Sequence, residues 1–184
     1  YLALDLGDKS VRDWAKRFRK IVSDANGIIS FSKEWRQPLM WAHYAESHKG
    51  LALGFEIPDR LLFKINYVEN RIKAGNNFNS SESAMRDLVD KLLGTKHKEW
   101  SYENEYRLLR PLDNCIREGD NFFASFNETT VLKEVILGAR YETSSSDHLT
   151  SELTSAGVTI QTARAEFKGF RMTTQRLASL KKQL

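Results

Sequence analysis

The chain of 184 residues has one cysteine, three prolines and no long apolar run. A single cysteine excludes a fold held by internal disulfides and favours a reducing compartment, so we expect a cytoplasmic protein. No run of about 18 apolar residues is present, and therefore no membrane span is predicted. The first residues, YLALDLGDKS, lack the basic and apolar regions of a signal peptide. Because the chain opens on Tyr1, in sequence typical of the middle of a domain, we expect its N-terminal segment to be missing.

Several well-known site motifs are also missing. The sequence has no G-x-x-x-x-G-K-[ST] loop, no G-x-G-x-x-G, no H-E-x-x-H and no G-x-S-x-G. His43 and His48 are five residues apart with no cysteine nearby, so we predict no metal site. Cys115 has no sequence-evident histidine neighbour to activate it, and no nucleophile is predicted there.

What is present is sufficient for a folded core. Hydrophobic residues make up 41% of the chain and aromatics 11%, which excludes a disordered chain. The formal net charge of +4 comes from the last segment, residues 168–184, which holds five basic residues and no acid. We interpret it as a solvated basic C-terminal tail that follows a single domain over residues 1–167. Nucleic-acid binding through this tail and the basic stretch at residues 9–20 is the less favoured alternative.

Hydrophobic periodicity and turn residues divide the domain into helices and strands. Ser10 is the expected N-cap of the first helix. Helices are predicted over residues 10–25, 38–47, about 80–93 and 144–156, and strands over 27–33, 51–57, 65–69, 105–111, 122–126, 132–138 and 158–167. The irregular alternation favours an α+β fold with a mixed, mostly antiparallel sheet and flanking helices.

The first unusual stretch is LMWAHYAESHKG, residues 39–50. Its large side chains point in several directions on a helix, which is typical of a helix buried on most faces. One interpretation is a tightly packed corner in which hydrogen bonds hold both imidazoles of His43 and His48. The other is that His48, close to a turn at Gly50, faces a ligand.

The second unusual stretch is KHKEWSYENEYR, residues 96–107. Glu103, Glu105 and Arg107 alternate along a predicted strand and therefore share one face. They form either a structural ion network or a functional pair of carboxylates that orients a substrate hydroxyl. Trp100 and Tyr102, just before them, belong either to the core or to the wall of a pocket.

Together and in this order, the two stretches resemble a bacterial domain-of-unknown-function family, two-nine-seven-one by number. Its members show an F-S motif, then M-W-x-H-Y-A-x-x-H-x-G before a hydrophobic strand, then W-x-Y-E-x-E-x-R-L. The matching residues here are Phe31, Ser32, Met40, Trp41, Ala42, His43, Tyr44, Ala45, His48, Gly50, Trp100, Tyr102, Glu103, Glu105, Arg107 and Leu108. The resemblance covers about residues 28–140, where Ile136 and Gly138 end a further strand.

The resemblance implies a remote likeness to ADP-ribosyltransferases, with NAD as the substrate. Glu105 would then hold a ribose hydroxyl and stabilise an oxocarbenium-like transition state. Glu103 would contact the acceptor or a second hydroxyl, and Arg107 would position the carboxylates or a phosphate. The residues expected to line the ligand site are Trp41, His43, Tyr44, His48, Trp100 and Tyr102.

Two functions therefore remain open after the sequence is read. The first is an NAD-using, ADP-ribosyltransferase-like enzyme, a toxin or phage-defence effector. The second is a nucleotide-sensing or interaction module without chemistry of its own. The sequence predicts no oligomeric state.

Overall fold

The computed structural model describes residues 2–3, 7–73, 82–142 and 147–182. By the density of contacts within it, the chain divides into two compact units, each built from two separate segments. The first unit comprises Tyr1–Lys33 and Asp59–Ser125, and the second comprises Glu34–Pro58 and Phe126–Leu184. A compact unit need not be an independent domain, so the predicted domain over residues 1–167 stays a prediction.

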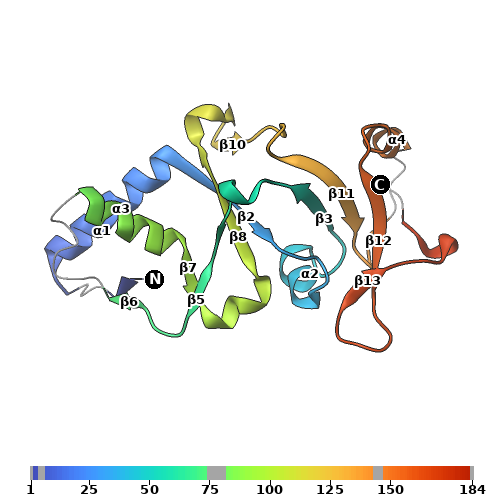
Figure 1. Ribbon diagram of the computed structural model, residues 1–184, viewed down its shortest axis with the longest axis horizontal. Helices are drawn as coiled ribbons and strands as arrows, with labels where there is room; N and C mark the ends of the chain where they lie inside the picture. The colour runs from blue at the N-terminus through green and yellow to red at the C-terminus, as the bar shows by residue number, and fades with distance from the viewer. Residues whose placement is uncertain (1, 4–6, 74–81, 143–146, 183–184) are drawn as a thin grey trace. The chain divides into compact units, whose positions relative to one another are not determined.

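The first unit is organised around the antiparallel sheet β2-β8-β4 (Figure 1). Strands β5 and β7 pair in parallel, as do β1 and β6, and β9 and β10 form a hairpin. The elements are β1 (Leu2–Ala3), α1 (Lys9–Ala25), β2 (Asn26–Ser32), β4 (Phe63–Lys64), β5 (Asn66–Val68), β6 (Ile72–Lys73), α3 (Glu82–Leu93), β7 (Thr95–His97), β8 (Glu105–Pro111), β9 (Ile116–Glu118) and β10 (Asn121–Phe123).

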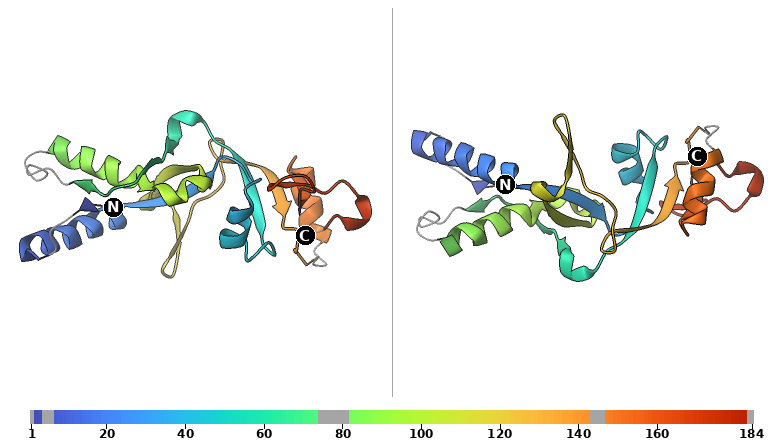
Figure 2. Two further views of the ribbon diagram at one scale, coloured as in Figure 1. Left: turned by 90° about the horizontal axis from the view of Figure 1, so that it is seen from below. Right: turned by 90° about the horizontal axis from the view of Figure 1, so that it is seen from above.

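The second unit contains the sheet β13-β12-β11-β3, which includes one parallel pair, β11 with β12. Its elements are α2 (Pro38–Tyr44), β3 (Leu51–Glu56), β11 (Val131–Leu137), α4 (Asp147–Ser155), β12 (Thr159–Ala165) and β13 (Met172–Thr174). Alternate residues of β11 point to opposite faces of the sheet. Ile136 packs with Trp41 of α2, whereas Val135 and Leu137 pack with Leu153 of α4. The two helices therefore cover opposite faces (Figure 2).

The observed elements confirm the α+β class and the mixed, mostly antiparallel sheets.

Several boundaries differ for local reasons. Helix α1 begins one residue earlier than predicted, because Asp8 caps it: its Oδ1 accepts hydrogen bonds from the backbone N (2.7 Å) and Oγ (2.8 Å) of Ser10. Helix α2 ends at Tyr44, since the backbone turns left-handed shortly afterwards. Strand β13 lies within the predicted basic tail. Residues 80–81 and 144–146 of two predicted helices lie outside the described residues.

Candidate functional site

The two predicted glutamates sit where a short 3-10 helix, η2 (Lys98–Glu103), leads into β8. Asn104 separates them and has left-handed backbone angles (φ 44°), which asparagine tolerates better than most residues. The Oγ of Ser32 donates to the Glu103 carbonyl at 2.7 Å, and the N–H of Glu105 donates to the Tyr67 hydroxyl at 2.8 Å. The backbone between the two acids is thus tied to neighbouring elements on both sides.

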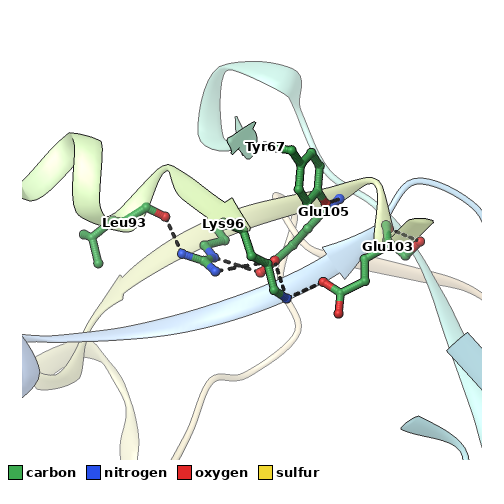
Figure 3. A network of polar contacts seen from close by, with 7 residues as sticks. Tyr67, Leu93, Lys96, Glu103 and Glu105 are labelled. Carbon is green, nitrogen blue, oxygen red and sulfur yellow. Dashed lines mark hydrogen bonds and ion pairs between the residues drawn. The ribbon is translucent and has the colours of Figure 1, made fainter. Parts of the chain in front are cut away.

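The carboxylates themselves belong to a buried ion network (Figure 3). Glu103 and Glu105 are 3% and 4% exposed. Lys96, on β7, pairs with Glu103 and lies 3.0 Å from Oε2 of Glu105. Arg107 donates from Nε to Oε1 of Glu105 at 2.8 Å and from Nη1 to the carbonyl of Leu93. Two acids and two bases therefore balance one another away from solvent.

The network shifts the ionisation of its members. Burial alone would raise the pKa of Glu105, but hydrogen bonds from Arg107, Ser30 and Lys96 outweigh it and lower that pKa. Burial alone would lower the pKa of Lys96, but the hydrogen bonds from Lys96 to the two glutamates outweigh it and raise that pKa above the usual value. Both groups are charged at neutral pH, as a structural ion network requires.

The aromatic residues before the acids flank this network. Trp100 is 38% exposed, and the Nζ of Lys96 lies 5.2 Å from the centre of its ring. The rings of Trp100 and Tyr102 lie 6.0 Å apart. Lys96 therefore contacts both the indole ring of Trp100 and the two acids, and partly exposed Trp100 packs on the cation.

The second group of predicted residues forms a corner in the other unit. Pro38 opens α2 behind the N-cap Gln37, and Trp41 on this helix is 2% exposed. The indole Nε1 of Trp41 donates to the Trp35 carbonyl at 2.6 Å, and its ring stacks on His48 with centroids 6.4 Å apart. Trp41 therefore fixes both the helix and the turn after it.

The turn after α2 has an uncommon backbone. Glu46, Ser47 and His48 all have positive φ angles of 46°, 53° and 71°. Two hydrogen bonds hold this turn against the residues after β11. The N–H of Arg140 donates to the carbonyl of His48 at 3.0 Å, and the N–H of Gly138 donates to the carbonyl of Gly50 at 2.9 Å. A side chain at Gly138 would lie 2.1 Å from the His48 carbonyl oxygen, which explains the glycine.

The corner presents polar and aromatic groups outward. Tyr44 is 60% exposed, and His43 is exposed beside it with the two ring centroids 6.3 Å apart. His48 is partly buried, and burial together with the charge of Arg140 lowers its pKa below the usual value. At neutral pH His48 is therefore an uncharged imidazole next to a cation.

The predicted site residues thus form two groups, one in each unit. Lys96 joins Glu103 to Glu105, Arg107 pairs directly with Glu105, and Trp41 contacts His48. That the two groups share one cleft stays a prediction.

Reading the motifs alone missed Lys96, Tyr67 and Arg140 as partners. The WSYENEYR stretch contains two acids and one base, and this excess of acid was the available signal for a second cation. Among the described residues no group of three or more acidic, histidine or cysteine side chains is arranged to hold a metal ion.

Comparison with known proteins gives one match. Residues 40–108 match the model of a family described as "Protein of unknown function (DUF2971)", a range that contains both sequence stretches. No curated protein and no solved structure matches the chain. Within the described part of the chain, none of the helices combines the length and apolar character needed to cross a bilayer.

Proposed function

We propose that this protein, whose residues 40–108 match the DUF2971 family, is a binding module for a nucleotide-like small molecule. In this proposal Glu103 and Glu105 stabilise the fold. Recognition is provided by helix α2 and the turn after it, residues 38–50, called the Trp41 corner. The observation that carries it is the contrast between the two groups of residues. Glu103 and Glu105 are buried in ion pairs, whereas His43 and Tyr44 are open to solvent.

The state of the acids argues against chemistry at this pair. A carboxylate that aligns a ribose hydroxyl needs an oxygen free to accept from the substrate. Both oxygens of Glu105 already accept from Arg107 or Lys96. Opening this network would leave buried charges unpaired, which costs several kcal/mol.

The corner has the properties of a rigid recognition surface. Because buried Trp41 packs against the interior and fixes the corner, little conformational freedom is lost when a ligand binds. The exposed ring of Tyr44 offers a face for stacking a base. Neutral His48 supplies one donor and one acceptor, and neighbouring Arg140 supplies positive charge for a phosphate.

Thermal-shift measurements with NAD, ADP-ribose, ATP and adenosine test the proposal. We expect a phosphate-bearing nucleotide to raise the melting temperature without being consumed, because a ligand of the folded state stabilises it. Tyr44→Ala should abolish the shift, whereas the control Tyr106→Phe, on β8 of the other unit, should keep it. Absence of any shift with all four compounds contradicts the proposal.

The second candidate is an NAD-using, ADP-ribosyltransferase-like enzyme acting as a toxin or phage-defence effector in the cytoplasm. The favouring observation is that Glu103 and Glu105 lie where η2 leads into β8, and that Trp100 of η2 is 38% exposed. Incubation with NAD followed by chromatography of free nicotinamide separates the two functions. Nicotinamide release that disappears in Glu105→Gln supports the enzyme and overturns the binding-only proposal. No release by the wild-type protein supports the binding module.

A further inference from the structure

A cleft of about 400 Å³ lies within the second unit. The residues that line it include Thr162 and Ser179, which carry hydroxyl groups, and the basic residues Arg164, Lys181 and Lys182. Among the described residues that line it, none is acidic. The cleft contains none of the residues that the sequence motifs predicted for a site.

The topology of the sheet explains where the cleft lies. Strands β11 and β12 run in parallel with Leu137 opposite Thr162, so both carboxyl ends reach the same edge of the sheet. Ala139, just after β11, and Arg164, near the end of β12, line the cleft there. In open α/β sheets ligands bind outside the carboxyl ends of parallel strands, and the β11–β12 pair has this arrangement locally.

The same edge also carries the corner described above. Strand β3 is antiparallel to β11 and pairs Leu51 with Leu137. The turn that contains His48 precedes Leu51 and is bonded to Arg140, next to Ala139. The corner and the cleft are therefore neighbours along one sheet edge within one unit.

The basic segment after β13 is fixed to the sheet. The N–H of Gln175 donates to the carbonyl of Thr162 at 2.7 Å, and the N–H of Lys182 donates to the hydroxyl of the same residue at 2.8 Å. These bonds bring Lys181 and Lys182 to the cleft. The positive charge there is therefore positioned by the fold, which a solvated tail would not achieve.

Within the described part of the chain, the basic side chains at the cleft have no ion-pair partner. Among the ion pairs that join described residues, none involves Arg164, Lys181 or Lys182. The guanidinium of Arg164 lies 4.6 Å from the ring centre of Phe167 and donates to the Ala165 carbonyl, which holds this side chain in place. Ammonium and guanidinium groups together with hydroxyl donors are the groups that bind phosphate in proteins.

We infer that this cleft binds the phosphate groups of a small phosphate-bearing ligand. Its volume is in the range for small-molecule sites and fits a diphosphate with part of its attached group. The inference rests on the proposed function and deepens it, because it gives the phosphates of a nucleotide-like ligand a place beside the Trp41 corner. The base would contact Tyr44, and the phosphates would contact Lys181 and Lys182.

Isothermal titration calorimetry with inorganic pyrophosphate and with ADP-ribose, at about 0.15 M salt, tests the inference. We expect K181Q/K182Q to weaken the binding of both compounds at least tenfold. The matched control K168Q/R176Q removes the same charge from exposed positions of the same segment that do not line the cleft, and it should change affinity less than twofold. An equal loss in both variants, or no loss in K181Q/K182Q, overturns the inference.

The outcomes also separate this inference from the proposed function. If ADP-ribose binds with unchanged affinity in K181Q/K182Q, the cleft inference fails while the binding module stands. If pyrophosphate binds and depends on the two lysines but no nucleotide binds, the proposed function fails while the cleft stands. A single-stranded oligonucleotide that binds far more tightly than pyrophosphate and loses affinity in K181Q/K182Q overturns the assignment to a small ligand.

Discussion

The Nζ atom of Lys96 lies 3.0 Å from Oε2 of Glu105 and also pairs with Glu103. One cation therefore joins the end of a 3-10 helix to the start of a central strand. Because all three side chains are largely buried, each depends on the others for compensation of its charge. This arrangement leads to the first two predictions.

Lys96→Met should destabilise the protein by about 3 kcal/mol, because it leaves two buried carboxylates with less compensation. Urea denaturation at pH 7.5, followed by tryptophan fluorescence, measures the free energy of unfolding. Lys98→Met is the matched control, since Lys98 pairs with Glu69 where both side chains are more than half exposed. Its effect should stay below about 0.5 kcal/mol. Equal effects of the two substitutions would contradict a buried network.

Glu105→Gln should be less stable than the wild-type protein at pH 7, and the difference should vanish in acid. The folded protein lowers the pKa of Glu105 below its ordinary value of 4.5. Its charge therefore contributes stability above pH 4.5, and this contribution is lost as the pH falls through the folded pKa. Urea denaturation of both proteins between pH 7 and pH 3 checks the trend. A difference that is constant over this range would show that the charge of Glu105 is not the cause.

His48 should titrate below its ordinary pKa of 6.5, because burial and the charge of Arg140 disfavour its protonation. The neutral form is favoured by folding, so its stability contribution is complete above pH 6.5 and is lost as the pH falls through the folded pKa. NMR titration of the His48 ring gives the midpoint. Arg140→Gln should raise this midpoint, and Arg117→Gln, in the β9–β10 hairpin, should leave it unchanged. If the midpoint is the same in Arg140→Gln as in the wild-type protein, the charge of Arg140 does not lower the pKa of His48.

Gly138→Ala should destabilise the second unit by about 2 kcal/mol. Its new methyl group would lie 2.1 Å from the His48 carbonyl oxygen and 2.7 Å from that of Gly50, and neither backbone group can move without opening the turn. Gly169→Ala is the control, because the nearest atom there belongs to the flexible end of Glu166. Urea denaturation of the two variants and the wild-type protein compares their unfolding midpoints, and we expect only Gly138→Ala to lower the midpoint markedly. If Gly138→Ala is as stable as the control, the turn is not fixed as described.

The sequence predicts the elements well where hydrophobic periodicity is strong. The apolar face of residues 10–25 and the alternating pattern of 105–111 correspond to α1 and β8. It fails where long-range contacts decide the structure. The left-handed run at residues 46–48 depends on hydrogen bonds to residues after β11, and strand β13 depends on pairing with β12. Local sequence propensity cannot predict either feature, because both depend on residues far away in the sequence.

The candidate site was predictable in part. Alternation along β8 places Glu105 and Arg107 together, and the two residues do form an ion pair. The sequence left open whether this is a network or a functional pair, because the answer depends on Lys96, which comes from another strand. The cleft was not predictable, since its lining joins residues of β12, Ala139 just after β11 and a segment interpreted as a tail.

The order of the strands has a consequence for synthesis of the protein on the ribosome. Strand β3 pairs with β11, and residues 59–125, which belong to the first unit, are translated between the two. Until residue 137 has emerged, β3 has no β11 to pair with, and Trp41 lacks Ile136, on which it packs. A nascent or truncated chain that stops before β11 therefore exposes an unpaired strand and a large indole, the features that recruit chaperones and promote aggregation.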